Sequence, residues 1–208
     1  MVLNVILILV FAGVFGFCMR DGVWTNTLRL INVILAATIA SSFGEPMARV
    51  LSGMHTKSFL FHNILGVWLV FAFACTALNE ATKYISRVNV KFNERFNLIG
   101  GYVLAGVLAF VFLSFTLFTM HQAPLAKNFA RGSFNADSRM FFGTAPDRQW
   151  HDYLWYVSQG AYSAGEARHF DPNDEYYRNY EKYRNAIENY AKDKGTLGVD
   201  KTSGFSRK

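Results

Sequence analysis

Histidine–carboxylate pairs are the first candidates for chemistry in this chain of 208 residues. His151 is followed directly by Asp152, and His169 stands two residues before Asp171. A zinc pair on a helix needs ligands at positions i and i+4, because side chains at that spacing leave the same face, whereas adjacent residues cannot both aim at one ion. We therefore predict no metal ligands and no residues that bind a cofactor.

The sequence motifs of the common enzyme classes are also missing. The chain contains no GxSxG nucleophile turn, no Walker A loop, no dinucleotide-binding GxGxxG and no HExxH. Nucleophilic, phosphoryl-transfer and redox chemistry thus lack their usual sequence signatures. We expect no catalytic residues and predict that the protein is not an enzyme.

The two cysteines, Cys18 and Cys75, both lie within apolar runs. They form no CxxC motif, and a thiol in such a run usually behaves as a small hydrophobic side chain. We expect no disulfide framework in this protein.

The composition divides the chain into two unlike parts. Hydrophobic residues make up 51% of the sequence, charged residues 17%, and the net charge is +6. The first 120 residues hold eight Lys or Arg and four Asp or Glu, whereas the last 88 hold thirteen and eleven. We interpret 1–120 as a transmembrane domain and 121–208 as a tail that faces water or lies on the membrane surface. The modest positive charge is typical of contact with anionic headgroups, so nucleic acid is not an expected partner.

Three segments have the length and apolar composition of membrane-spanning helices, which need about 20 residues. They are Val2 to Met19, Phe59 to Leu78 and Leu98 to Met120. A fourth segment, Leu28 to Phe43, is shorter, because Gly44, Glu45 and Pro46 are expected to stop it. The predicted fold class is an all-α membrane protein, with a small bundle of about four transmembrane helices, the second short or tilted, and a helical amphipathic C-terminal tail.

Few strongly polar side chains occur at membrane depth in these segments. Arg29 stands near a helix end, where its long side chain can reach the headgroups; the others are Asn4, Asn32, His62 and Asn63. Such groups commonly form hydrogen bonds between helices, and a transport pathway is the alternative interpretation. The absence of buried charge argues against an ion-coupled transporter.

Small residues recur at helical spacing in two of the segments. Four-residue intervals separate Ala36, Ala40 and Gly44 in one segment, and Gly101, Ala105 and Ala109 in the last. Such a stripe lets two helix backbones approach closely. Packing within the bundle and self-association of two copies both remain open.

The orientation in the membrane is not determined by the positive charges. Lys and Arg near the ends of four spans are almost equally numerous on the two sides. Lys83, Arg87, Lys91 and Arg95 are spaced by four, which fits a basic stripe on a helical extension of the third span. Alternation of apolar and polar residues over 88–92 fits an extended stretch equally well.

The tail is expected to hold two helices, at about 145–159 and 172–194. Thr144 is a candidate N-cap for the first, and Asp171 followed by Pro172 predicts the start of the second. One face of the second helix carries tyrosines, which either pack internally or contact a partner: Tyr176, Tyr180, Tyr183 and Tyr190. Beyond Gly195 the composition predicts a disordered end.

Three motifs give the first 120 residues a family resemblance. The first span contains Gly13 and Gly16 and ends in Arg20, Asp21 and Gly22. A helix of small residues follows, and Arg95 precedes the glycines of the last span, Gly100, Gly101 and Gly106. These features resemble the CvpA (colicin V production) family of small bacterial membrane proteins with about four spans. Asn4 stands where the family often has an acidic residue, and the tail resembles the extensions of planctomycete-type members.

The resemblance implies a multi-pass protein of the bacterial inner (cytoplasmic) membrane, linked to toxin production or export and to envelope homeostasis. The family provides no catalytic residues to transfer. We expect a membrane scaffold or accessory protein that contacts the lipid bilayer, with a homo-oligomer and a protein partner of the tail as candidate associations. The alternative is a passive channel or transporter accessory formed by an oligomer.

Overall fold

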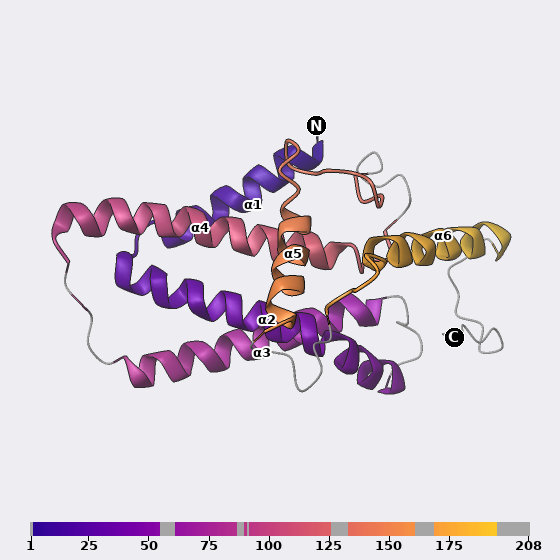
Figure 1. Ribbon diagram of the computed structural model, residues 1–208, viewed down its shortest axis with the longest axis horizontal. Helices are drawn as coiled ribbons and strands as arrows, with labels where there is room; N and C mark the ends of the chain where they lie inside the picture. Colours follow the sequence, from indigo (N-terminus) through magenta and orange to yellow (C-terminus); the bar gives the residue numbers. More distant parts are fainter. Residues whose placement is uncertain are drawn as a thin grey trace.

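The computed structural model describes residues 2–54, 61–86, 90, 92–125, 133–160 and 169–194. Its regular elements are six α-helices: α1 (Val2–Cys18), α2 (Val23–Met54), α3 (His62–Ile85), α4 (Glu94–Met120), α5 (Pro146–Ser158) and α6 (Tyr176–Lys194). Figure 1 shows α2, α3 and α4 running along the long axis of the molecule, with α1 beside α4 and α5 crossing the bundle. The predicted all-α fold is confirmed.

Three of the described helices, α2, α3 and α4, are long and apolar enough to cross a membrane. The N-terminal α1 is apolar but shorter, with 17 residues. At about 1.5 Å per residue it reaches roughly 25 Å, the low end of the length that spans a hydrocarbon core. The chain is thus a membrane protein built on four apolar helices. Phe59 and Leu60, the expected start of the third span, lie outside the described residues.

The second helix is longer than predicted. α2 has 32 residues and continues through Gly44, Glu45 and Pro46 to Met54, so the expected stop at Gly44–Pro46 is wrong. Close packing against α3 explains the difference. A Cβ added at Gly66 of α3 would lie 2.7 Å from the Gly44 carbonyl oxygen and 2.8 Å from the Ala48 nitrogen. Backbone contact with α3 therefore holds this part of α2 helical despite the proline.

The core of the bundle pairs small residues of α2 with large rings of α3 and α4. Ala36, Ala37 and Ala40 are fully buried, and they pack in one cluster with Phe71 and Phe115. The rings of Phe71 and Phe115 lie 4.9 Å apart, centre to centre. Alanines on α2 thus leave the space that the aromatic rings fill, which closes the middle of the bundle with apolar side chains.

Hydroxyl side chains inside the apolar helices satisfy their own hydrogen-bonding groups. Each donates to the carbonyl oxygen one helical turn earlier, at 2.7–3.1 Å: Thr27, Thr38, Ser41, Ser42, Thr76, Thr82, Ser114 and Thr116. This arrangement spares the helices an unsatisfied polar group where water is excluded.

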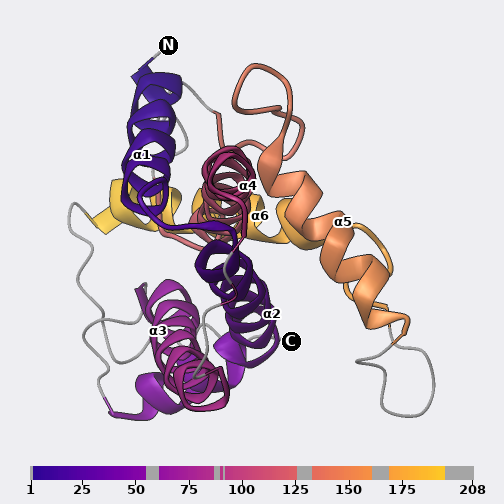
Figure 2. The same cartoon turned by 90° about the vertical axis from the view of Figure 1, so that its left-hand side faces the viewer.

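The C-terminal residues 133–160 and 169–194, together called the cap, fold back on the bundle. In Figure 2, α5 lies alongside α4 and α2, and α6 crosses behind the bundle. Trp150 of α5 packs against Phe115 of α4, with ring centroids 5.6 Å apart, and donates to Ser41 of α2 at 3.3 Å. The tail is therefore joined to the membrane helices by direct contacts.

The helix α5 begins differently from the prediction. Its N-cap position is Ala145, in a left-handed conformation with φ 46°, so the prediction of Thr144 as N-cap is wrong. The Thr144 hydroxyl instead donates to the carbonyl of Phe141 at 2.7 Å. That carbonyl closes the preceding turn and competes for the hydroxyl, while Pro146 at the start of the helix needs no N–H partner.

The helix α6 begins four residues later than predicted, at Tyr176 instead of Pro172. Asp171 has a positive φ of 48° and opens a turn in which the Asp174 N–H donates to the Asp171 carbonyl at 3.1 Å. Pro172 lies inside this turn. The Asp171 carboxylate still caps α6, because it accepts from the backbone N–H groups of Glu175 (2.9 Å) and Tyr176 (2.8 Å). The predicted disordered end after Gly195 lies outside the described residues.

Candidate functional site

A buried asparagine ties together the end of the bundle where α1 ends and α2 and α4 begin, here called the joint. Asn26 is fully buried, and its side-chain Nδ2, with two N–H donors, lies within hydrogen-bond distance of three carbonyls, those of Cys18 (3.0 Å), Asp21 (3.2 Å) and Gly101 (3.1 Å). Those carbonyls belong to α1, to the turn after it and to α4. One side chain therefore fixes three segments, and its own Oδ1 has no partner among the described residues.

Glycines allow the joint to close. A Cβ added at Gly101 would lie 2.8 Å from the Asp21 carbonyl oxygen, and one added at Gly100 would lie 2.6 Å from Cγ2 of Val23. Gly22 faces Asn97 of α4, whose Oδ1 accepts from the Val23 N–H at 2.9 Å. Three residues singled out by the sequence, Gly22, Gly100 and Gly101, thus meet at one place.

Arg29 forms an ion pair at the joint. Arg29 donates from Nη1 to the carboxylate of Asp21 at 2.7 Å, and its guanidinium lies 5.3 Å from the ring centre of Phe17. Its position one to two turns into α2 lets the side chain reach the end of α1. Two of the remaining motif residues, Arg20 and Arg95, are exposed at this end of the bundle.

The other predicted site residues fall into two groups. A Cβ at Gly13, Gly16 or Gly106 would meet no atom within 4 Å. The small-residue stripes, in contrast, lie buried inside the chain: Ala36, Ala40 and Gly44 on α2, and Gly101, Ala105 and Ala109 on α4. Contacts within one copy therefore account for both stripes.

A second polar cluster joins α2 and α3. Asn32 donates to Oδ1 of Asn79 at 2.8 Å, and its own Oδ1 lies 3.0 Å from the Thr82 hydroxyl, whose one O–H is shared with the carbonyl of its own helix. This bears out the interpretation of Asn32 as a hydrogen-bonding link between helices. Asn79 was missed because it directly follows Leu78, where the span was expected to end; α3 continues to Ile85.

The basic stripe expected on one helical extension is not formed. Lys83 lies in the last turn of α3, whereas Arg95 lies in the first turn of α4, behind the N-cap Asn93. Ser86, at the C-cap of α3, ends that helix, so of the two alternatives that the sequence left open, the helical extension carrying all four residues is not formed. Arg87 and Lys91 lie outside the described residues.

At the opposite end, a buried histidine–aspartate pair connects the bundle to the cap. His121, just after α4, and Asp147 of α5 are each 1% exposed at the side chain, with Nε2 and Oδ2 3.1 Å apart. Burial lowers the pKa of the His121 imidazole, and the Asp147 carboxylate partly offsets that effect. No sequence pattern indicated this pair, because its members are 26 residues apart.

Tyrosines of α6 complete the docking of the cap. Tyr176 stacks on Phe118 of α4, with ring centroids 4.5 Å apart, and its hydroxyl accepts from Gln122 at 2.9 Å. Tyr177, which the sequence did not single out, is buried, and its hydroxyl donates to the Asp147 carbonyl at 3.1 Å. Burial raises the pKa of both hydroxyls, so they stay protonated at neutral pH.

The other three tyrosines of the predicted face are described to different extents. Tyr180 packs edge-on against Tyr176, with ring centroids 4.9 Å apart, and Tyr183 is half-buried. The backbone of Tyr190 lies in α6. At least the N-terminal part of this face therefore packs within the chain.

A buried arginine holds the irregular segment before α5. Arg184 of α6 donates to the carbonyls of His121 (2.9 Å) and Phe134, and burial lowers its pKa. A guanidinium supplies several donors in a fixed plane, so one side chain can satisfy two chain segments at once. Loops 121–125 and 133–140 are thereby fastened to α6.

One cluster has the composition of a metal site. Ligand atoms of His151, Asp171 and Asp174 lie within 4.8 Å of one another, and Nε2 of His151 is 3.1 Å from Oδ2 of Asp171. His151 thus pairs with Asp171, 20 residues away, instead of using Asp152 as its main partner. The Asp171 carboxylate also accepts from backbone N–H groups at the start of α6. Capping of this helix therefore accounts for the position of the carboxylate without a metal ion.

Comparison with known proteins gives one clear similarity. The family model described as Colicin V production protein matches residues 3–142. The match includes the four apolar helices and continues past Met120 into the segment before α5. No curated protein and no solved structure matches the chain.

Proposed function

Because the chain belongs to the Colicin V production protein family, we propose that it is a multi-pass scaffold or accessory protein of the bacterial inner membrane. The family resemblance links it to toxin production or export and to envelope homeostasis. In this proposal the bundle anchors the protein and fixes the cap at one end, and the chain performs no catalysis. The cap then contacts a protein partner, a second copy or the membrane surface.

The closed middle of the bundle is the observation that supports a scaffold most directly. The buried layer between the joint and the cap contains Ala36, Ala40, Phe71 and Phe115, and the described residues place no charged side chain in it. A solute path through one copy needs polar groups or water along its length. The polar clusters lie instead at the two ends, where they hold segments together.

Exposed aromatic residues on the cap offer a contact surface. Tyr156 is 75% exposed and Phe142 is 71% exposed, and Trp155 lies beside Tyr156 on α5. Aromatic side chains of this kind favour the headgroup region of a membrane or the centre of a protein interface. They, and not the partly buried Tyr176, are the residues that we assign to partner or membrane contact.

Complementation tests the proposal. In a colicin V-producing strain that lacks its own family member, the wild-type chain is expected to restore toxin release into the medium. Replacing Phe142 and Tyr156 by Ala should reduce release severalfold at unchanged membrane levels. Phe73→Ala is the matched control, because Phe73 is 78% exposed on α3, away from the cap. Normal membrane levels of wild-type protein without toxin release would contradict the function.

A channel formed by several copies is the second candidate, and α1 supplies the observation for it. A Cβ added at Gly13 or Gly16 would meet no atom within 4 Å, and Leu9 and Phe17 on the same helix are 65% and 72% exposed. A second copy can therefore approach α1 closely. Liposomes containing the purified protein should show no solute flux if the scaffold proposal holds. Flux that Gly16→Phe abolishes would favour the channel, because a Cβ at this position meets no atom of its own chain within 4 Å.

A further inference from the structure

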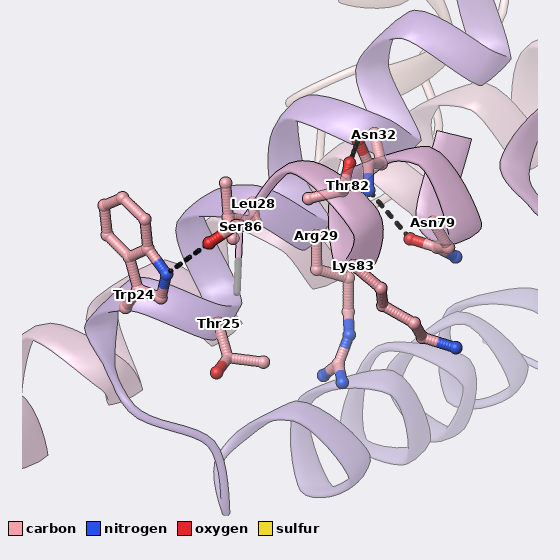
Figure 3. Close-up of a pocket in the computed structure, with 9 residues that line it drawn as sticks. All are labelled: Trp24, Thr25, Leu28, Arg29, Asn32, Asn79, Thr82, Lys83 and Ser86. Carbon is pink, nitrogen blue, oxygen red and sulfur yellow. Dashed lines mark hydrogen bonds between the residues drawn. The ribbon is translucent and has the colours of Figure 1, made fainter. Parts of the chain in front are cut away.

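A polar pocket opens between α2 and α3 at the joint end of the molecule. Its volume is about 290 Å³, and Figure 3 shows the side chains that surround it: Trp24, Thr25, Leu28, Arg29, Asn32, Asn79, Thr82, Lys83 and Ser86. The Asn32, Asn79 and Thr82 cluster lies on one side. In Figure 3 the side chain of Arg29 runs downward from one helix and that of Lys83 toward the lower right from the other.

The charged residues that line the pocket are both cations. Arg29 comes from α2 and Lys83 from the last turn of α3, and no carboxylate is among the lining residues. Asp21 and Glu80 pair with them from outside the pocket, at 2.7 Å and 2.6 Å. The Asp21 carboxylate accepts a hydrogen bond from Nη1 of Arg29. The planar guanidinium carries further N–H donors. Arg29 and Lys83 thus each have one carboxylate partner outside the pocket, and their further N–H donors suit an anion.

Hydrogen-bond donors accompany the cations. The Thr25 hydroxyl lines the pocket, and the ammonium of Lys83 carries three N–H donors. A phosphate group offers several acceptor oxygens and negative charge, which suits a guanidinium fork together with an ammonium group.

The position of the pocket favours a lipid as the carrier of the phosphate. α2 begins at Val23 and α3 ends at Ile85, so Arg29 and Lys83 stand within about two turns of the helix ends. Headgroup phosphates lie at this level of a membrane protein, just outside the hydrocarbon core. Trp24 at the pocket donates to Ser86 at 3.2 Å, and tryptophan is typical of the membrane–water interface.

We propose that this pocket binds the phosphate group of an anionic membrane lipid, held between Arg29 and Lys83. The apolar Leu28 at the pocket wall is available to an acyl chain. The site is independent of the scaffold function, because it rests on the pocket alone. A lipid bound here would join α2 to α3 at the joint, where the protein's own contacts are polar.

Thermal unfolding of the purified full chain in neutral detergent tests the site. Short-chain phosphatidylglycerol is expected to raise the melting temperature in a saturable way, because a ligand that binds only the folded state stabilises it. Phosphatidylcholine with the same acyl chains should do so much less. Lys83→Gln should weaken the apparent affinity for phosphatidylglycerol at least about tenfold, as a lost charge-assisted contact does, whereas Lys83→Arg should retain it.

A control variant separates lipid binding in the pocket from a general effect of the protein's positive charge. Lys182→Gln on the exposed surface of α6 makes the same change of charge far from the pocket and should leave the affinity unchanged. Equal stabilisation by both lipids, or equal weakening in Lys83→Gln and Lys182→Gln, would overturn the proposal. Lys83 is 71% exposed, so its replacement should not unfold the chain; Arg29→Lys supplies a second variant that keeps the charge.

Inorganic phosphate distinguishes the two sources of the ligand. At the same concentration it should stabilise the chain far less than phosphatidylglycerol, because it lacks the acyl chains. A saturable shift by inorganic phosphate that matches the lipid, and that Lys83→Gln removes, would overturn the lipid as ligand and assign a free phosphate to the pocket.

Discussion

At the scale of single residues, Asn26 connects separate segments at the joint. Its amide reaches carbonyls in α1, in the following turn and in α4, so three separate segments depend on one side chain. The contacts with Cys18 and Gly101 are buried, and a buried carbonyl that loses its donor is costly. The asparagine therefore determines how α1 joins the other helices.

Replacing Asn26 by Leu should lower stability markedly. The expected loss is about 1–3 kcal/mol, because carbonyls buried at the joint lose their donor. The measurement is thermal unfolding in detergent, compared with Asn179→Leu at an exposed position of α6. Equal melting temperatures for the two variants would show that the joint does not depend on this amide.

His121 should make the docking of the cap sensitive to pH. Its folded-state pKa is lowered by burial, so the unfolded chain binds more protons than the folded chain below the ordinary pKa of about 6.5. Stability should therefore fall as the pH drops from about 7.5 to 5.5, by at most about 1.4 kcal/mol per pH unit for one group. The groups whose charge acts on the imidazole are Asp147, Arg184 and Arg148.

The variant His121→Gln isolates this contribution. Its melting temperature in detergent should change less between pH 7.5 and 5.5 than that of the wild type, because the amide does not titrate. His169→Gln changes an exposed histidine in the cap and should keep the wild-type dependence. An unchanged pH dependence in His121→Gln would refute the role of this residue.

At the scale of elements, the crossing of α2 and α3 depends on Gly66. Because an added Cβ would lie 2.7–2.8 Å from backbone atoms of Gly44 and Ala48, Gly66→Ala should push the helices apart. We expect a loss of about 1–3 kcal/mol in thermal stability, as in other overpacked cores. Gly106→Ala is the control, since its Cβ meets nothing within 4 Å and alanine favours helix. A smaller effect at Gly66 than at Gly106 would disprove the tight crossing.

Local patterns predicted the elements that have strong apolar character. The spans corresponding to α3 and α4 follow from uninterrupted apolar runs, and Cys18 and Cys75 are free, as expected. The sequence failed where contacts between distant segments outweigh local preference. Gly44 and Pro46 are helix breakers by propensity, but α3 packs against α2 at Gly44 and Ala48, and α2 continues.

The candidate sites show the same division. Gly22, Gly100 and Gly101 were recognised by type and spacing, and the structure brings them together at the joint. Asn26, His121 paired with Asp147, and Arg184 were missed, because each acts on partners that no local pattern connects to it. Sequence separations of 75, 26 and 63 residues explain why only the three-dimensional arrangement identifies them.

At the scale of the whole molecule, the two ends of the bundle differ in construction. The joint end holds the turn between α1 and α2 and the pocket, whereas the other end carries the cap. Figure 1 places the N-terminus at the same end of α4 as the cap, opposite the α1–α2 turn. Four helices that all cross the membrane bring the chain back to the side on which it began.

Cysteine labelling should therefore show that the cap and the far end of α2 share one side of the membrane. In a chain with Cys18 and Cys75 replaced by Ala, single cysteines at Gly53 and Asn179 report that side, and one at Glu94 reports the other; all three positions are exposed. A membrane-impermeant maleimide added to intact cells should label either the cysteines at Gly53 and Asn179 or the one at Glu94. The cysteines on the other side should be labelled only after lysis. Because an odd number of crossings separates Gly53 from Glu94, and an odd number separates Glu94 from Asn179, common labelling of Glu94 and Asn179 would exclude α4 as a span.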